Sequence, residues 1–424
     1  MPPAWPKAHN RRASPTPHCD HTITARLIRS WQECRPVSDR GTPIRVALPL
    51  LARGIYIAPF FILYRPLELL AQVARTSPHV QSPHIHHTTM ATTKLKIVFG
   101  AMTFGRPDVE QTRVHDLKDA AAILDVFQKH GHDEVDTART YGNGSSEEYL
   151  GQLDLPKRGI TLDTKLAPGS KPGGKAYTHR PEDLKPALLD SLKALNTDKV
   201  DLWYLHVPDR SVPYEDTLRE VNNLYEQGYF KRLGISNYAA WEVAQITEIC
   251  IRNNWKRPDV YQGVYNALHR AAEPELFPCL RHYGISFYEY NPLAGGLLTD
   301  RYERTTADKD VEPGSRFDPT KDQGANYRTR YWKDEWFDAL DIVRPAVKAA
   351  GIKTTAEAAL RWVVHHGVLD SKYGDAVIIG ATSAAQLEDN LTSLEQGPLP
   401  DEVAKAFDDA WPIFKPVCKP YYRV

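Results

Sequence analysis

The order of apolar and polar residues changes character at about residue 94. Beyond it, short runs rich in Val, Ile, Leu and Tyr alternate with longer stretches whose apolar residues recur every three or four positions. The short runs predict β-strands and the longer stretches predict amphipathic helices. We expect strands at residues 96–100, 133–138, 161–166, 200–206, 230–237, 260–266, 285–291 and 376–381.

Helical patterns lie between and after these runs. We expect helices at residues 116–130, 146–152, 181–195, 214–227, 241–253, 273–283, 335–349, 355–366, 383–391 and 401–411. A strand, a loop and a helix thus repeat about eight times, which is typical of an α/β protein of the (β/α)8 TIM-barrel type. A doubly wound open sheet is the alternative, but no Gly-x-Gly-x-x-Gly fingerprint follows the first strand.

Residues 1–89 differ in composition from the rest. They hold 12 of the 32 prolines, 11 of the 53 Lys and Arg residues, and only 4 of the 53 Asp and Glu residues. Residues 46–64 are long enough to cross a membrane, but an arginine and two prolines count against a span. A transit peptide, a disordered tail and a natural start at Met90 are the other interpretations. We expect an N-terminal extension, 1–89, and a barrel domain, 90–424.

Composition narrows the class of protein. A hydrophobic content of 42% and a charged content of 25% are ordinary for a soluble globular enzyme. A formal net charge of zero argues against nucleic acid as the main partner. The cysteines are few, odd in number and without metal-ligand spacing: Cys19, Cys34, Cys250, Cys279 and Cys418. They fit a reducing compartment, so we expect a cytoplasmic protein, or a mitochondrial one if residues 1–89 are a transit segment.

Four polar residues lie where predicted strands end. Asp136 ends one strand and Tyr141 lies on the loop behind it, while Lys165 and His206 end the next two strands. In a parallel barrel these side chains would meet at the C-terminal face, where barrel enzymes have their active sites. A nearby ammonium lowers the pKa of a phenol, and a histidine can hydrogen-bond a carbonyl oxygen. The group predicts proton donation to a carbonyl whose hydride comes from a cofactor, although each residue alone is ordinary.

From about residue 96 to residue 423 the chain resembles the aldo-keto reductases, especially the aflatoxin-aldehyde reductase branch. The matching segments are GAMTFG at 100–105, DTARTY at 136–141, DTK at 163–165, DLWYLH at 201–206, LGISNY at 233–238, VYQ at 260–262, YNPLAGGLL at 290–298, and 380–390. The resemblance implies a (β/α)8 barrel that reduces aldehydes and some ketones with NADPH. It implies Tyr141 as the general acid, Asp136 and Lys165 as its tuning pair, and His206 as the residue that orients the carbonyl, with no metal.

The resemblance also implies where NADPH binds. Ser236, Asn237 and Gln262 would hold the nicotinamide carboxamide, whose donors and acceptors these side chains can pair. Tyr290 would stack on the nicotinamide ring, and residues 291–301 would wrap the pyrophosphate. The expected cofactor residues are Met102, Ser236, Asn237, Gln262, Tyr290, Asn291, Leu293, Gly295, Leu297, Arg301, Arg316, Gly380, Ser383, Gln386 and Asn390.

The chain departs from the widest family pattern at the site for the adenosine 2′-phosphate. That pattern has a Lys-Ser pair and an Arg, whereas this chain has Gly380-Ala381 and Gln386. The branch shows the same departure, so NADPH is still expected, with a less secure preference over NADH. Arg316, in the long polar segment 297–334, is expected to supply the missing charge.

The resemblance places Tyr327, Arg330 and Arg423 at the substrate. Two guanidiniums at one pocket predict a substrate with a carboxylate, such as the semialdehyde of a short diacid, and dialdehydes also fit. The alternative is a set of surface arginines. The expected partner is a small aldehyde, with neither nucleic acid nor membrane, and a homodimer is typical of the branch.

Two other functions compete with reduction. Some relatives of the family are non-catalytic, NADPH-sensing subunits of ion channels, but here all four catalytic positions are filled. A metal-dependent barrel hydrolase would need clustered His and Asp ligands at the strand ends, where only His206 is so placed.

Overall fold

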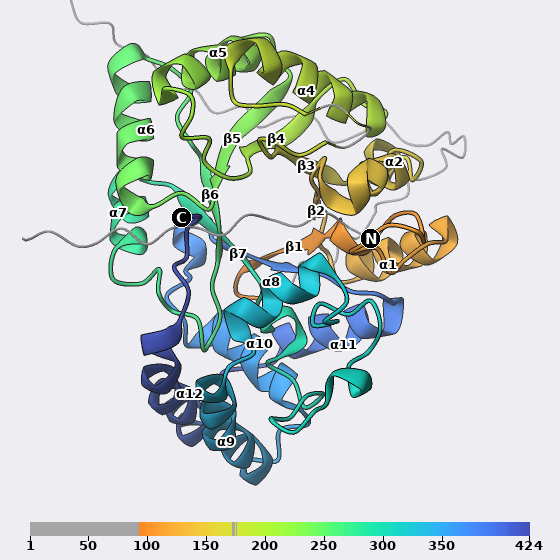
Figure 1. Cartoon of the computed structure of the whole chain (residues 1–424), viewed down its shortest axis with the longest axis vertical. Helices are drawn as coiled ribbons and strands as arrows, with labels where there is room; N and C mark the ends of the chain where they lie inside the picture. The colour runs from red at the N-terminus through yellow and green to blue at the C-terminus, as the bar shows by residue number, and fades with distance from the viewer. Residues whose placement is uncertain (1–92, 172–173, 175) are drawn as a thin grey trace, which may run out of the picture. The chain divides into compact units, whose positions relative to one another are not determined.

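Eight parallel strands close into a barrel in the computed structural model, which describes residues 93–171, 174 and 176–424 (Figure 1). The strands follow one another in sequence order, and β1 pairs with both β2 and β8. The predicted (β/α)8 barrel is therefore confirmed and the open sheet is excluded. The expected extension at residues 1–89, with its membrane or transit segment, lies outside the described residues.

The strands lie close to the predicted ranges. They are β1 (Lys96–Gly100), β2 (Glu134–Asp136), β3 (Thr161–Leu166), β4 (Val200–Leu205), β5 (Phe230–Ser236), β6 (Val260–Val264), β7 (Ser286–Tyr290) and β8 (Ala376–Ile379). The register pairs Asp136 with Asp163 and Lys165 with Tyr204. The C-terminal ends of β2, β3 and β4 consequently lie at one edge, as expected for neighbouring parallel strands.

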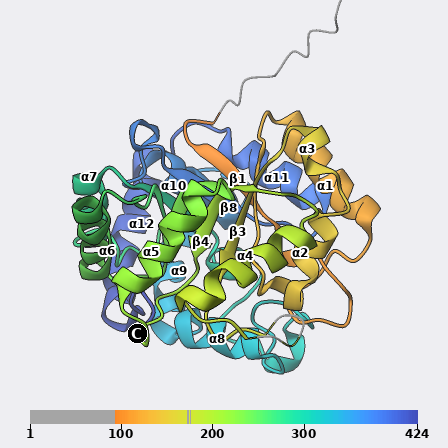
Figure 2. The same ribbon diagram turned by 90° about the horizontal axis from the view of Figure 1, so that it is seen from above.

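Helices cover the outside of the barrel, except for α8 (Asp322–Tyr331), which lies beside the cavity at the C-terminal end. They are α1 (Leu117–Lys129), α2 (Ser145–Leu150), α3 (Leu155–Arg158), α4 (Pro181–Ala194), α5 (Tyr214–Glu226), α6 (Ala240–Asn253), α7 (Leu276–Tyr283), α8 (Asp322–Tyr331), α9 (Asp334–Ala349), α10 (Thr355–His365), α11 (Ala384–Leu394) and α12 (Asp401–Phe414). Figure 2 shows α4 and α5 in front of β3 and β4, with α8 at the lower edge of the view. Asp116, Thr354 and Ser383 cap α1, α10 and α11, each accepting a backbone N–H of the first turn.

The local patterns missed two helices. The segment 297–334, predicted as a long polar loop, contains α8, and the short α3 follows α2. In α8 only Gly324 and Tyr331 are buried, so it lacks the apolar stripe that marks the other helices. No described helix is both long and apolar enough to cross a membrane.

The barrel interior has an apolar middle layer. It consists of Val98, Leu202, Tyr204, Val260, Tyr288, Ala376 and Ile378, and it is separate from the larger core between sheet and helices. A Cβ built on Gly234 would lie 2.1 Å from Cδ1 of Tyr204. The Tyr204 ring therefore packs directly against the backbone of β5, and this position requires a glycine.

Charged residues occupy the interior at the N-terminal end of the strands. We call Lys96, Glu134, Asp163, Asp201 and Arg232 the N-terminal charge cluster. Glu134 contacts Lys96 and lies 3.1 Å from Arg232, which lies 2.5 Å from Asp201 and 3.9 Å from Asp163. Burial and the charge of Glu134 raise the pKa of Asp163 well above its usual value. Burial also opposes ionisation of Glu134, but Arg232 and Lys96 more than offset it and lower its pKa. Of the two neighbouring carboxyl groups, Glu134 and Asp163, it is thus Asp163 that holds a proton.

Candidate active site

A buried Lys–Asp pair lies at the C-terminal end of the barrel. Nζ of Lys165 donates to Oδ1 of Asp136 at 2.5 Å and to the carbonyl oxygen of Thr137 at 2.7 Å. Nε2 of Gln262 donates to Oδ2 of Asp136 at 2.9 Å, so both carboxylate oxygens are bonded. Burial lowers the pKa of Lys165 and raises the pKa of Asp136, while the contact between the two opposes both shifts. The pair is held rigidly below the cavity.

The phenol of Tyr141 lies above this pair. Its Oη is 3.5 Å from Nζ of Lys165, which sits 4.9 Å from the ring centroid. We expected Lys165 to lower the pKa of this phenol, but burial and the nearby Asp136 raise it well above 10. Desolvation of the phenolate outweighs the attraction of the Arg316 guanidinium, which lowers the pKa. Tyr141 therefore stays protonated, which is the form that can donate a proton.

His206 faces Tyr141 edge-on, with ring centroids 5.7 Å apart. Burial, followed by the charge of Lys165, lowers the pKa of His206 to about 3, so the imidazole is neutral. Its Nδ1 is buried and has no hydrogen-bond partner among the described residues. Two neutral donors thus converge beside a single cation, an arrangement suited to an oxygen that gains negative charge.

A cavity of about 1190 Å³ opens above these groups. Most residues predicted from the resemblance line it: Met102, Asp136, Tyr141, His206, Asn237, Gln262, Tyr290, Asn291, Leu293, Gly295, Arg301, Arg316, Tyr327, Arg330, Gly380, Gln386, Asn390 and Arg423. Lys165 is buried beneath it. Three predicted cofactor residues do not line it. Ser236 is buried against Asn237, Leu297 belongs to the hydrophobic core, and Ser383 caps α11.

The amide side chains near Tyr141 are bonded within the protein. Nδ2 of Asn237 donates to the carbonyl oxygen of His206 at 3.0 Å, and its Oδ1 accepts from Tyr290 at 2.7 Å. Because Gln262 binds Asp136 through Nε2, only its Oε1 is free of that contact. A nicotinamide carboxamide would therefore meet an acceptor on Gln262, while a contact with Asn237 would exchange one of its present bonds.

The loop after β7, residues 291–298, which we call the anion loop, contains several residues in left-handed conformation. Asn291, Ala294, Gly295 and Gly296 have φ angles of 68°, 51°, 72° and 106°. Left-handed backbone can form a nest that binds phosphates, but the N–H groups of Ala294 and Gly296 donate within the loop, to the carbonyl oxygens of Asn291 and Leu293, so other N–H groups of the loop would have to serve. A Cβ on Gly296 would meet nothing within 4 Å, so the loop is open on that side. Across the groove, Oγ1 of Thr103 donates to the carbonyl oxygen of Ala381 at 2.7 Å. These residues fit the pyrophosphate of a dinucleotide.

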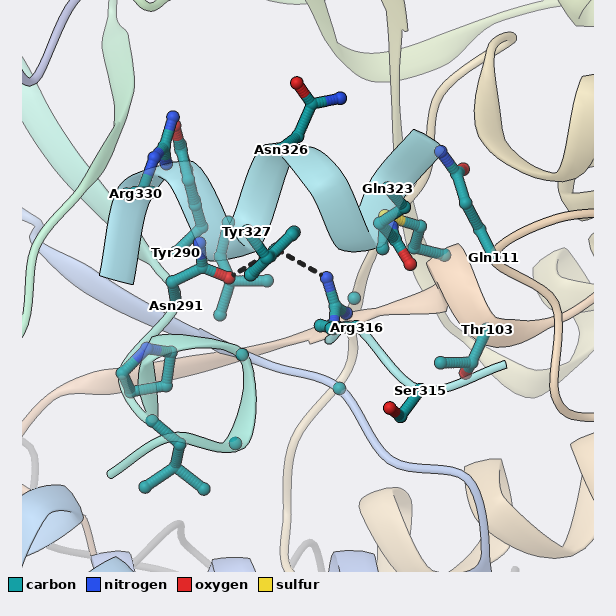
Figure 3. Close-up of a pocket in the computed structure, with 18 of the residues that line it drawn as sticks. Thr103, Gln111, Tyr290, Asn291, Ser315, Arg316, Gln323, Asn326, Tyr327 and Arg330 are labelled. Atoms are coloured by element: carbon teal, nitrogen blue, oxygen red, sulfur yellow. Dashed lines mark hydrogen bonds between the residues drawn. The ribbon is translucent and has the colours of Figure 1, made fainter. Parts of the chain in front are cut away.

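Helix α8 forms one wall of the cavity, as Figure 3 shows. Nη1 of Arg316 donates to Oη of Tyr327 at 2.6 Å, and Tyr327 donates to Oδ1 of Asn291 at 3.0 Å. A Cβ on Gly295 would lie 2.4 Å from the Tyr327 ring, which therefore packs directly against the anion loop. No carboxylate in the described part of the chain pairs with Arg330.

The C-terminal segment closes another side. The backbone N–H of Arg423 donates to the carbonyl oxygen of Asn237 at 2.8 Å, and its own carbonyl accepts from Arg210 at 2.7 Å. The Arg423 side chain is exposed at the rim. The two predicted substrate arginines thus reach the same cavity from different segments.

Sequence reasoning missed the loop between β1 and α1. Glu110, Gln111 and Arg113 line the cavity, and the N–H of Gln323 donates to Oε1 of Glu110 at 2.5 Å. Glu312 bridges Arg113 and Arg301 above the groove. These polar residues belong to no motif, and their charge alone does not distinguish them from surface residues.

Fold and site first define the class of protein: a (β/α)8 barrel with a buried lysine, a protonated tyrosine and a neutral histidine at the base of a cavity. The sequence model of the Aldo/keto reductase family matches residues 96–412. Aldo-keto reductase MYCFIDRAFT_156381 of Pseudocercospora fijiensis is 56% identical, covering 71% of this chain and 100% of the relative. Aldo-keto reductase pigE of Monascus ruber is 48% identical, with 78% and 98% covered. Aflatoxin B1 aldehyde reductase member 4 of Homo sapiens is 44% identical, with 77% and 96% covered. The chain belongs to the aldo-keto reductase family and is an oxidoreductase.

Proposed function

We propose that the chain is an NADPH-dependent reductase of aldehydes in which Tyr141 is the general acid. The observation that carries the proposal is the protonated phenol of Tyr141, 3.5 Å from Nζ of Lys165 and beside a neutral His206, at the base of the cavity. The similarity to proteins named aflatoxin B1 aldehyde reductase supports aldehydes as the substrate class.

The residues of the chain divide the work of proton transfer. NADPH would supply the hydride for the carbonyl carbon. His206 would donate a hydrogen bond to the carbonyl oxygen and hold it beside Tyr141. As that oxygen becomes negative, the O–H bond of Tyr141 breaks and an O–H bond of the product alcohol forms. Lys165 would stabilise the phenolate that is left, and Asp136 would hold Lys165 in place.

The groove offers a separate contact for each part of the cofactor. Asn237, Gln262 and Tyr290 lie near Tyr141, at the expected nicotinamide end. The anion loop and the N-terminus of α11 would hold the phosphates, because both present backbone N–H groups. Arg316 would bind the adenosine 2′-phosphate and so favour NADPH over NADH. In the structure it is bonded to Tyr327, so it would share or exchange that partner.

Arg330 and Arg423 support a semialdehyde as substrate. Both line the cavity, and Arg330 is without a carboxylate partner in the described residues. A guanidinium in that state binds a substrate carboxylate strongly. A homodimer and a cytoplasmic location stay predictions.

The test is to mix the purified full-length protein with NADPH or NADH and to follow oxidation of the cofactor with succinic semialdehyde and with 4-nitrobenzaldehyde. We expect turnover of both aldehydes, faster with NADPH. Tight NADPH binding without turnover of any aldehyde would favour the competing non-catalytic sensor.

A further inference from the structure

The turn that carries Tyr141 is neither regular helix nor strand. Tyr141 begins the short segment Tyr141–Gly144, in which Gly142, Asn143 and Gly144 have φ angles of 54°, 50° and 92°. Left-handed backbone is seldom kept over three residues unless the surroundings impose it. The position of the phenol therefore depends on contacts that fix the ends of the turn.

One guanidinium fixes the far end. Nη1 of Arg139 donates to the carbonyl oxygen of Gly144 at 3.1 Å and to Oε2 of Glu147 at 3.1 Å. A Cβ built on Gly144 would lie 2.7 Å from this nitrogen, so the guanidinium packs directly on the backbone. The backbone N–H of Arg139 donates to the carbonyl oxygen of Lys165 at 3.3 Å. Arg139 thus joins the end of the turn to strand β3.

Glu147 is the anchor of this guanidinium. Its side chain is fully buried, and its Oε1 accepts from Oγ1 of Thr164 at 2.6 Å. Thr164 directly precedes Lys165 in β3, and neighbouring side chains of a strand point to opposite faces. Thr164 reaches Glu147 in α2, whereas Lys165 reaches Asp136 inside the barrel. One carboxylate therefore connects the turn that bears the phenol to the strand that bears the ammonium.

We propose that Arg139 and Glu147 are a positioning pair that sets the separation of Tyr141 and Lys165 and aims the phenol at the substrate oxygen. The inference rests on the proposed role of Tyr141 as the acid. Neither member of the pair lines the cavity, so neither has a direct contact with cofactor or substrate. Their loss should slow proton transfer and leave binding intact. A small displacement of a reacting group costs on the order of 10²-fold in rate.

The first test is Arg139→Met in the full-length protein. Burial already raises the pKa of Glu147, so the carboxyl that loses its partner can take up a proton instead of staying as an unpaired charge. We expect kcat to fall roughly 10- to 100-fold. KM and the Kd for NADPH, measured by fluorescence titration, should stay within about twofold. The solvent deuterium isotope effect on kcat should rise, because proton transfer would become rate-limiting.

Three companion variants separate positioning from general damage. Arg139→Lys should restore part of kcat, since an ammonium can reach both acceptors. Thr164→Val removes only the hydroxyl that holds Glu147 and should lower kcat less than Arg139→Met does. Arg106→Met is the matched control. Arg106 pairs at 2.9 Å with Glu148, which lies in α2 next to Glu147, and the Arg106 side chain is half-exposed. This variant should leave every constant unchanged.

Two results would overturn the positioning role. One is a kcat within about twofold of the parent for Arg139→Met, when Tyr141→Phe has lost activity. The other is an equal loss of kcat and of NADPH affinity, which indicates general disorder of the site. If Arg139→Met does not fold, Thr164→Val takes its place. The positioning role is then overturned if Thr164→Val has the same kcat and the same isotope effect as the unmodified protein. Full activity of Tyr141→Phe would instead contradict the proposed function itself.

Discussion

Charged side chains fill both ends of the barrel interior, but they are paired differently. In the N-terminal charge cluster, Arg232 has three carboxyl groups within 3.9 Å and Glu134 has two cations. At the C-terminal end, Lys165 has one carboxylate, and Tyr141 and His206 are neutral. Charge is shared among several ions at the first end, whereas the second end has a single Lys–Asp pair with neutral donors beside it.

The difference indicates what each end does. Balanced and mutually bonded charges lower the cost of burying polar groups and respond little to a new molecule. A cation that faces neutral donors attracts an oxygen as it becomes negative. If the proposed function holds, the same kind of side chain serves stability at one end and chemistry at the other.

The largest effect is expected for Tyr141→Phe, which removes only the phenol oxygen. Because a single general acid is worth about 10²–10⁴ in rate, kcat should fall by that factor while the Kd for NADPH changes little. Steady-state kinetics and a binding titration are the measurements. Tyr204→Phe is the matched control, because its buried hydroxyl has no hydrogen-bond partner among the described residues. A variant Tyr141→Phe that kept more than about a tenth of kcat would show that another group is the acid.

The same comparison predicts that Arg232→Met costs stability and not rate. Removing one member of a buried ion pair leaves uncompensated carboxylates, at a cost of the order of 3 kcal/mol. Arg232 is 27% exposed, so part of this loss is screened. Denaturant titration should show the lower free energy of unfolding, with kcat unchanged. A fall in kcat at full stability would mean that the two ends are coupled.

Arg330 tests the proposed substrate end, where the guanidinium has no carboxylate partner of its own. Arg330→Met should lower kcat/KM for succinic semialdehyde roughly 10- to 150-fold, mostly through KM, because a charge-assisted contact is worth about 1.5–3 kcal/mol. A neutral benzaldehyde should be reduced as before. Arg423→Met should act in the same direction but less strongly, since its side chain is exposed. Equal losses on both aldehydes would indicate a structural role of α8.

The smallest effect is expected for Asp163→Asn, with a gain of roughly 1 kcal/mol near neutral pH. The folded protein holds the proton of Asp163 more tightly than the unfolded chain does, because burial raises the pKa. That contribution to stability is full below pH of about 4 and is lost as the pH rises toward the folded pKa. Asparagine cannot ionise, so its advantage should grow from pH 4 to pH 8. A constant difference over this range would show that Asp163 is not the protonated carboxyl.

Local sequence patterns predicted most of the fold and part of the site. The ranges of β1 and β3 were predicted to the residue. An apolar run bounded by loops marks β1, whereas β3 holds only two apolar residues and was found from its place in the strand-helix repeat. Lys165 and His206 could be found because they end strands. The bond from Gln262 to Asp136 joins residues 126 positions apart, and no local pattern carries that information. Helix α8 was missed because it covers a polar groove and needs no apolar stripe.

The contact between β1 and β8 is where the barrel closes, and it joins the first and last strands of the sequence. Thr103 and Ala381, bonded across it, are 278 residues apart. The cavity extends along this junction, with Gly100 and Met102 on one side and Gly380 and Gln386 on the other. A bound dinucleotide would therefore link the segments that follow the first and last strands of the sequence. At a concentration of 100 times Kd it would add about 2.7 kcal/mol to the free energy of unfolding. Because such distant segments associate late, activity during refolding should return after the helical signal and sooner when NADPH is present.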